Sequence, residues 1–373
     1  MAVERLSIQQ LRNLSAVDIY PSPEVNLFFG ENGSGKTSLL EALYILGLGR
    51  SFRSHKHKSL INRDSFEFTI FSNLRSSDDR NSLPLGISRN QQGDAVFKAM
   101  GEAVNSIADL AGYLPLQLIN SNAFLLLEGG PTERRQFLDW LVFHVEPKFF
   151  PVWKRLQTCL KQRNSLLRHD RIDPQQLMVW DAELVSLTNQ LDQYRTETFT
   201  QFLIYFQRLK DDFVPLDGLV LSYYSGWNKD KTFAEALDAS QDRDIAFGQT
   251  HVGGHRADLK IQIDGHLAAD VLSRGQQKLL VCAMKLAQGL VFQALTGRKA
   301  IYLVDDLPAE LDDKHRQKLA KWLDQMETQV FVTGVDEADL RLLWETTPNK
   351  QVKVFHVEQG GVKEVKFDLK ESL

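Results

Sequence analysis

The chain has 373 residues, 43% of them apolar and 25% charged, with a net charge of −4 and a pI near 6.2. These values are typical of a soluble protein with a large core and argue against a globally basic nucleic-acid binder, so any DNA contact has to use a local basic patch. We find no signal peptide, no apolar run near the ~20 residues of a membrane helix, and two isolated cysteines, Cys159 and Cys282, which favours a reducing, cytoplasmic compartment without a disulfide or zinc site.

The N-terminal third is predicted to be mainly β-structure around one helix. Alternating apolar and polar residues predict strands at 5–11 and 16–20, and an apolar strand follows at 25–29. A helix is predicted from about Thr37, with leucines on one side. Residues 66–120 read as mixed and strand-rich, broken by a polar loop at 75–82.

The pattern changes at Pro131, after which glycine is almost absent for about eighty residues and apolar residues recur every three or four positions. This spacing predicts a helical hairpin with its turn at 168–174. Strands at 219–224 and 259–263 follow, and beyond residue 270 helices and strands alternate, which predicts a mostly parallel α/β sheet. We therefore expect an α/β nucleotide-binding head built from residues 1–125 and 216–373, with a compact α-helical lobe, residues 126–215, inserted between them.

A phosphate-binding loop lies at the end of the third predicted strand. The sequence G-E-N-G-S-G-K-T fits G-x-x-x-x-G-K-[S/T] at each fixed position and is followed by a helix. Backbone N–H groups of the small residues can surround phosphates, Lys36 is expected on the β- and γ-phosphates, and the Thr37 hydroxyl is expected to bind Mg²⁺. The predicted ATP-binding residues are Gly30, Glu31, Asn32, Gly33, Ser34, Gly35, Lys36 and Thr37.

An acidic pair ends a buried strand, in I-Y-L-V-D-D at 301–306. A phosphate loop needs such a carboxylate partner, so we assign Asp305 to Mg²⁺, directly or through water. Asp306 is placed to orient or deprotonate the attacking water, which makes it a catalytic candidate together with Lys36. A solvated acidic turn is the structural alternative.

A second anion-binding turn precedes the helix in L-S-R-G-Q-Q-K-L-L. Ser273, Gly275 and Gln276 stand where a hydroxyl and a helix N-terminus can hold a phosphate. One subunit already has its phosphate loop, so this turn is needed only if two subunits face each other and each touches the partner's γ-phosphate. The alternative is a simple helix cap of the form S-x-x-Q.

These three motifs together resemble the ABC-type ATPase heads of the SMC and Rad50 group, and several further stretches are similar to the RecF family of bacterial recombination and gap-repair proteins. The likeness covers nearly the whole chain in order. The stretches are L-R-N-L near the start, G-R-S-F-R-S at 49–54, G-G-P-T-E-R-R-Q-F-L-D-W at 129–140, K-Q-R-N-S-L-L-R at 161–168 and G-H-R-A-D-L at 254–259.

The resemblance implies a head with a short helical lobe and no long coiled coil. It also implies ATP-dependent dimerisation into a clamp on double-stranded DNA and single-strand/double-strand junctions, with slow hydrolysis of Mg-ATP. The family works with RecR, and through it RecO, to load RecA. The run L-P-A-E-L-D after Asp306 resembles the loop that joins the two nucleotide sites of such a dimer. That likeness points to Asp312, although an acidic helix start explains the residue equally well.

The chain departs from the family pattern at three places. Gly253-Gly254-His255 stands where Gly-Pro-His is usual, Asn120–Phe124 replaces a Ser/Thr-Pro-Glu stretch, and Thr333-Gly334 lies where many ABC proteins carry a histidine. The first change suggests a less rigid loop. The last is consistent with a slow ATPase.

DNA contact requires clustered lysines and arginines. The densest candidates, in 50–58 and at the start of the helical lobe, are Arg50, Arg53, Lys56, Lys58, Arg134 and Arg135. Arg50 or Arg53 could instead serve the nucleotide. Further cations, which a solvated helix face also explains, are Lys154, Arg155, Lys161, Arg163 and Arg168.

Two other classes of function stay open. A monomeric phosphate-loop kinase for a small molecule would use Asp306 as a substrate base and Ser273 only as a cap. An ABC-type signalling ATPase would act on a protein partner without DNA. The kinase predicts that Ser273→Ala is nearly silent, and the signalling ATPase predicts no change in ATP turnover on adding duplex DNA.

Overall fold

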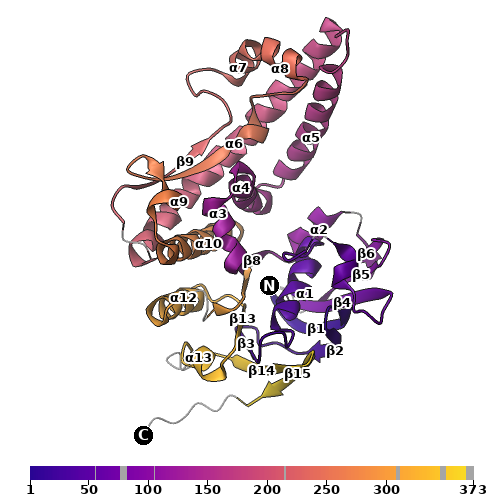
Figure 1. Cartoon of the computed structure of the whole chain (residues 1–373), viewed down its shortest axis with the longest axis vertical. Helices are drawn as coiled ribbons and strands as arrows, with labels where there is room; N and C mark the ends of the chain where they lie inside the picture. Colours follow the sequence, from indigo (N-terminus) through magenta and orange to yellow (C-terminus); the bar gives the residue numbers. More distant parts are fainter. Residues whose placement is uncertain are drawn as a thin grey trace. The chain divides into compact units, whose positions relative to one another are not determined.

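The computed structural model describes residues 1–54, 56–75, 82–104, 106–213, 216–307, 311–344 and 350–366. By its internal contacts the chain divides into two units (Figure 1). The head unit comprises residues 1–123 and 292–373, and the lobe unit comprises residues 124–291.

The head unit contains two six-stranded sheets. The first is antiparallel and has the order β2-β1-β4-β5-β6-β7. Its strands are β1 (Ala2–Leu11), β2 (Leu14–Ile19), β4 (Glu67–Arg75), β5 (Ser82–Asn90), β6 (Ala95–Ala99) and β7 (Glu102–Ala103). The second has the order β15-β14-β3-β13-β12-β8 and is parallel except for β15. Its strands are β3 (Val25–Phe29), β8 (Leu116–Ile119), β12 (Ile301–Val304), β13 (Val330–Gly334), β14 (Val352–Glu358) and β15 (Gly361–Val365).

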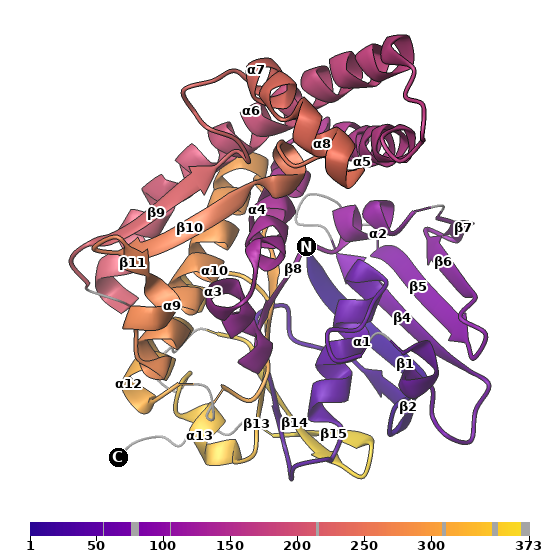
Figure 2. The same cartoon turned by 45° about the horizontal axis from the view of Figure 1, so that its top comes forward.

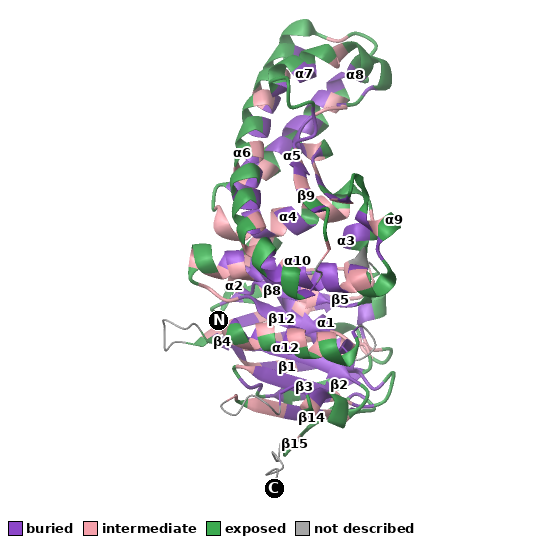
Figure 3. Cartoon of the chain, turned by 90° about the vertical axis from the view of Figure 1, so that its left-hand side faces the viewer, coloured by how far each residue is buried: buried purple, intermediate pink, exposed green. Residues whose placement is uncertain are grey.

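Helix α1 (Lys36–Leu48) lies between these sheets, with contacts to β1, β4 and β5 of one and to β13 of the other. Figure 2 shows it across the antiparallel sheet. Because both of its sides meet protein, apolar residues surround the helix, and ten of its residues are buried. Every residue of β12 and β13 is buried as well, as expected of central parallel strands (Figure 3).

Short helices complete the head. They are η1 (His57–Leu60), α2 (Ile107–Tyr113), α12 (Asp313–Gln325) and α13 (Glu337–Arg341), and η2 (Ser121–Phe124) lies at the sequence boundary between the units.

The lobe unit is built on the predicted helical hairpin. Helix α5 (Phe149–Leu166) packs on the 40-residue helix α6 (Pro174–Phe213), and the chain reverses between them as expected. A three-stranded antiparallel sheet is formed by β9 (Leu219–Tyr224), β10 (Asp258–Ile263) and β11 (His266–Leu267). The other elements of the lobe are α3 (Leu125–Glu128), α4 (Pro131–Val145), α7 (Phe233–Ala239), α8 (Gln241–Phe247), η3 (Gly254–Arg256), α9 (Ala268–Val271) and most of α10 (Arg274–Thr296).

The predicted α/β class, the order of the elements and the helical hairpin agree with this architecture. The second boundary differs, because the contacts place residues 216–291 with the lobe rather than with the head. The reason is that β10 packs on α4 and β9 packs on α6, which ties this sheet to the helices of the lobe.

Helix α10 is more apolar than the sequence inspection indicated. Among the described helices it alone is long and apolar enough to cross a membrane, and about two thirds of its apolar stretch is buried inside the protein. A buried core helix meets the same criterion, and the burial of α10 explains its composition.

Candidate functional site

The phosphate loop has the predicted strand–loop–helix geometry, with β3 ending at Phe29 and α1 starting at Lys36. Glycine is required at two of its positions. Gly30 has φ +148°, and a Cβ there would lie 2.2 Å from the Val357 carbonyl oxygen; Gly35 has φ +123°, and its Cβ would lie 2.8 Å from Leu14 Cδ2. A side chain at either position would distort the loop whose N–H groups face the phosphates.

The Lys36 ammonium is already held inside the loop. Its Nζ donates to the carbonyl oxygens of Gly30 at 2.6 Å and of Glu31 at 2.8 Å, and the residue is only 7% exposed. Burial lowers the pKa of Lys36, while the charges of Asp306 and Asp305 oppose the shift. The lysine is therefore preorganised to receive phosphate oxygens.

The acidic pair meets the phosphate loop through Thr37. Strands β3 and β12 are parallel and separated only by β13, so their carboxyl ends share one edge of the sheet. Thr37 Oγ1 donates to Asp305 Oδ1 at 3.0 Å. Burial raises the pKa of Asp305, and the Asp306 charge adds to the rise, whereas the hydrogen bonds from Thr333 and Thr37 oppose it. Asp306 follows with a φ of +53°.

Sequence reasoning missed the role of Thr333 in this site. Its Oγ1 donates to Asp305 Oδ1 at 2.8 Å and accepts the Asp306 backbone N–H at 2.7 Å, so one hydroxyl holds both acids. Its position at the end of a strand could have indicated a role in the site. The sequence analysis noted only that a histidine is absent there. The order β3-β13-β12 is what brings Thr333 between the loop and the acids.

A cavity of about 640 Å³ opens over these groups, a volume that suits a nucleotide. Phosphate-loop residues, both acids and Thr333 line one part of it. Other lining residues come from the β1–β2 turn, from the segment after α1 and from the turn before β4, and include Arg12, Asn13, Arg53, Asn62, Arg63 and Asp64. Arg53 is one of the DNA candidates named from the sequence, and its position in the cavity lining favours the alternative that it serves the nucleotide.

Buried Glu41 organises the arginines of this cavity. Its carboxylate accepts Arg12 Nη2 at 2.8 Å and Arg12 Nε at 3.0 Å, and Arg53 Nη1 lies 3.7 Å away. Because Arg12 also donates to the Ser59 carbonyl at 2.6 Å, the two segments that carry these arginines are tied together.

The site can supply oxygen ligands to Mg²⁺. Thr37 and Asp305 already contact each other, and Mg²⁺ commonly takes one or two protein ligands together with phosphate and water. Among the described residues, no group of three or more His, Cys, Asp or Glu side chains forms an alternative metal cage.

The second anion-binding turn lies in the lobe unit, at the start of α10. Ser273 N donates to Gln276 Oε1 at 3.0 Å, and Gln276 N donates to Ser273 Oγ at 3.4 Å, which is the reciprocal pattern of a capping box. Ser273 and Gly275 are exposed, and Gly275 has open space around its Cα. The turn caps its own helix and also presents a hydroxyl and N–H groups to solvent.

Asp312 is an N-cap as well. It accepts the His315 backbone N–H at 3.0 Å at the start of α12, and this hydrogen bond lowers the pKa of its carboxyl group. The middle of the L-P-A-E-L-D run, residues 308–310, lies outside the described residues.

The DNA candidates fall into two groups. Arg50, Lys56 and Lys58 are exposed, and the described part of the chain shows no ion pair for them. Arg134 instead holds Asp258 through two bonds of 2.7 and 2.9 Å, and Arg135 donates to the Ala257 carbonyl at 2.8 Å. These two arginines join α4 to β10 and to the residue before it, so their charges serve the fold of the lobe.

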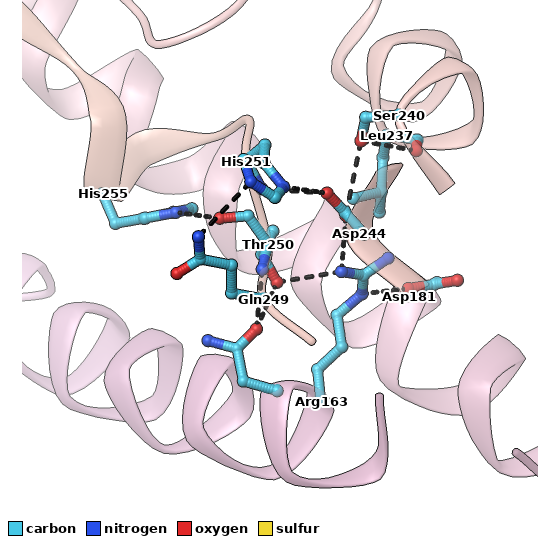
Figure 4. Close-up of polar contacts among 10 residues, drawn as sticks. Arg163, Asp181, Leu237, Ser240, Asp244, Gln249, Thr250, His251 and His255 are labelled. Atoms are coloured by element: carbon cyan, nitrogen blue, oxygen red, sulfur yellow. Dashed lines mark hydrogen bonds and ion pairs between the residues drawn. The ribbon is translucent and has the colours of Figure 1, made fainter. Parts of the chain in front are cut away.

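Arg163 does not lie on a solvated basic face, which corrects that part of the sequence interpretation. Its side chain is 0% exposed; it donates to Asp181 at 2.6 Å and to Asp244 and Thr250 at 2.7 and 2.8 Å (Figure 4). The residue fixes α5 to α6 and α8.

The Gly-Gly-His loop is ordered by its own contacts. Gly253 donates to the Gly226 carbonyl oxygen at 3.2 Å, and His255 Nε2 donates to the Thr250 carbonyl oxygen at 3.1 Å. The Asn120–Phe124 segment follows Ile119, whose carbonyl oxygen accepts the Asp305 N–H at 2.9 Å, so it starts beside the acidic strand end.

Comparison with known proteins agrees with this fold. The model of the RecF/RecN/SMC N-terminal domain family matches residues 2–363. The DNA replication and repair protein RecF of Cellvibrio japonicus is 58% identical over 362 residues, covering 97% of this chain and 99% of that protein. The RecF protein of Azotobacter vinelandii is 49% identical over 364 residues, with coverages of 97% and 98%.

Two solved structures show the same fold. The recombination mediator protein RecF with ATP, from the RecFOR pathway, superposes with a TM-score of 0.85 at 23% identity, over 98% of each chain. An SMC head bound to the C-terminal winged-helix domain of ScpA superposes with a TM-score of 0.59 at 15% identity, over the whole of both chains.

Proposed function

Because the chain belongs to the RecF family of DNA replication and repair proteins, we propose that it is an ATP-driven clamp on double-stranded DNA. Two copies close on two Mg-ATP molecules, hold duplex DNA or a single-strand/double-strand junction, and open again after slow hydrolysis. The clamp acts in the cytoplasm with RecR, and through it RecO, to place RecA on gapped DNA.

The observation that carries the proposal is a nucleotide cradle in the head unit together with a separate exposed anion-binding turn in the lobe unit. The cavity is lined by phosphate loop, acids and Thr333, and the turn at Ser273–Gln276 is not among its lining residues. A partner copy gives that turn a ligand, because Ser273 Oγ and the Gly275 N–H can meet the γ-phosphate held by the partner's loop.

Within each site the residues have distinct roles. Lys36 and the loop N–H groups bind the β- and γ-phosphates, and Thr37 and Asp305 hold Mg²⁺, which neutralises phosphate charge. Asp306, fixed by the Thr333 hydroxyl, orients the attacking water. Asp312 lies at the dimer face, where its exposed carboxylate can reach the partner.

Light scattering tests the shared site. Wild type, Ser273→Arg and Asp306→Asn are weighed with ADP and then with Mg-ATP, and nucleotide binding is measured separately. We expect ATP, but not ADP, to double the mass of wild type and to keep Asp306→Asn dimeric for longer, while Ser273→Arg binds ATP and stays monomeric.

A mass that never changes although ATP is bound would overturn the shared site. The capping box at Ser273 would then be its whole role, and the kinase interpretation would take its place. Dimerisation without any effect of duplex DNA on ATP turnover, and without DNA binding, would favour the signalling ATPase.

A further inference from the structure

The lobe carries a concentration of positive charge that the nucleotide site does not use. Between Glu146 and Asp170 the sequence has no carboxylate and six cations, Lys148, Lys154, Arg155, Lys161, Arg163 and Arg168, in a chain with a net charge of −4. Most of this run is helix α5. Such a local excess needs a reason, because like charges repel one another along a helix.

Two of these cations are neutralised within the lobe. Arg163 is buried between Asp181 and Asp244 (Figure 4), and Arg155 pairs with Glu183 at 2.5 Å. The described residues offer no ion pair to Lys154, Lys161 or Arg168, and all three are exposed. Arg168 donates once, from Nε to the Gly248 carbonyl oxygen at 3.2 Å, which leaves its outer nitrogens available.

The three cations lie on one side of α5 at a spacing of seven residues, or about 10 Å along the helix. Lys154 and Lys161 are in the helix, and Arg168 follows its end. Apart from Arg155, which pairs with Glu183, the exposed residues between them are uncharged and polar, namely Gln157, Thr158, Gln162 and Ser165. We call this set of seven residues the basic face of α5.

The opposite side of α5 holds the basic face in place. Buried Leu156, Leu160 and Leu166 pack in the hairpin, and Arg163 bonds to α6 and α8. The cations are therefore spaced by a rigid element rather than by a loop.

We propose that the basic face of α5 binds the phosphate backbone of duplex DNA, a surface role that rests on the DNA-clamp function proposed above. Lysine, arginine, serine, threonine and glutamine are the side chains that contact phosphates. A protein partner would need a buried apolar or aromatic centre, which this face lacks. Contacts of this kind carry no base preference, so the binding is independent of sequence and sensitive to salt.

The test is the salt dependence of duplex binding. The triple variant Lys154→Gln/Lys161→Gln/Arg168→Gln and wild type are titrated with labelled duplex in Mg-ATP, between 50 and 200 mM KCl, by fluorescence anisotropy. The control is Lys229→Gln/Lys231→Gln/Arg243→Gln, which removes the same charge from exposed positions of the same unit, each next to an aspartate. Thermal unfolding and ATP binding check that each variant is folded.

We expect the slope of log affinity against log salt to fall by about 0.9 for each lost phosphate contact, up to about 3 in total, and affinity at low salt to fall at least tenfold. The control is expected to keep the wild-type slope. Lys161→Arg is expected to bind like wild type, because it retains the charge.

Three results would overturn the proposal. Equal slopes for the triple variant and wild type would remove DNA from this face while leaving the clamp intact, since wild type still binds. Unchanged DNA binding together with lost binding of poly-glutamate would reassign the face to an acidic protein. Absence of DNA binding by wild type, with ATP-driven dimerisation intact, would remove both the face and the DNA part of the proposed function.

Discussion

The head and the lobe each contain buried charged side chains, but the partners of these charges differ. In the lobe the partners belong to the same chain, whereas in the head the charges face a cavity. In the lobe, Arg163 and Asp244 are both 0% exposed and satisfy each other within the chain. In the head, Lys36 and Asp305 border an open cavity, and among the described residues the lysine donates to two carbonyl oxygens. A buried charge whose partner lies in the same chain becomes costly when that partner is removed, whereas a charge fixed beside a cavity is available to a ligand.

This difference explains why two arginines from similar basic stretches of sequence, Arg163 and Arg53, have different roles in the structure. Arg163 lies in a basic stretch of sequence, but three acceptors surround its guanidinium group in the folded lobe, so it cannot also bind DNA. Arg53 lies in a similar stretch, but its nearest carboxylate, on Glu41, is 3.7 Å away and is shared with Arg12. Its charge is therefore only partly neutralised beside the cavity.

Removing Arg163 from its buried ion pairs in the lobe is expected to give the largest loss of stability. Arg163→Met removes the arginine from the fully buried Asp244, which keeps its contacts with His251 and Ser240, and is expected to cost about 3–5 kcal/mol of unfolding free energy. Urea denaturation measures this loss, and ATP affinity should not change. Arg155→Met is the matched control, because its pair with Glu183 is at the surface and is worth at most about 1 kcal/mol. Equal losses for the two variants would contradict the distinction.

Removing the charge of Lys36 beside the cavity is expected to weaken ATP binding and to leave the stability of the fold unchanged. Lys36→Met should weaken ATP binding by about 1.5–3 kcal/mol, roughly ten- to hundredfold, because charged hydrogen bonds to the phosphates are lost. Its unfolding free energy without nucleotide should stay near that of wild type. Calorimetric titration and thermal unfolding measure the two quantities, with the exposed Lys98→Met as control. A large loss of stability would show that Lys36 serves the fold.

The lobe is also expected to lose stability in acid. Burial lowers the pKa of His255 from its ordinary 6.5 to about 4, and the hydrogen bond to the Thr250 carbonyl only partly offsets this. Between pH 6.5 and 4 the unfolded chain binds a proton that the folded chain excludes, so this contribution is complete above pH 6.5 and is lost as pH falls toward 4. Allowing for its partial exposure, we expect about 2 kcal/mol.

The difference between wild type and His255→Gln, measured by urea denaturation across this pH range, isolates the effect. The variant should lose less stability than wild type on acidification. His169→Gln, at an exposed position in the turn after α5, should follow wild type. Identical pH profiles for wild type and His255→Gln would disprove the assignment.

The smallest expected effect is on the pH dependence of Mg²⁺-ATP binding, where Thr333 and Asp306 act on Asp305 in opposite directions. Mg²⁺ needs the ionised carboxylate, so Mg²⁺-dependent ATP binding is present above the Asp305 pKa and is lost as pH falls through it. Thr333→Val removes a hydrogen bond that lowers this pKa, and Asp306→Asn removes a charge that raises it. The acid midpoint should therefore move up in the first variant and down in the second. Shifts in the same direction would contradict this arrangement.

Most of the fold could be predicted because its signals are local. The apolar strand at 25–29 and the three- and four-residue spacing beyond Pro131 determine β3 and the helical hairpin, since burial of one face selects the period. The boundary between lobe and head at residue 291 could not be predicted from such local patterns. It depends on β10 packing on α4, which is distant in sequence, and on β9, paired with β10, packing on α6.

The candidate site likewise has one part that local sequence determines and one part that depends on the tertiary structure. The sequence by itself determined the phosphate loop and the acidic pair, because each is a short motif whose glycines or strand end impose the geometry locally. Only the tertiary structure decided that Thr333 joins both acids, because β13 lies between β3 and β12 in the sheet but not in the sequence. It also decided which cations of α5 remain available, since burial and ion pairing depend on the elements that pack against a residue.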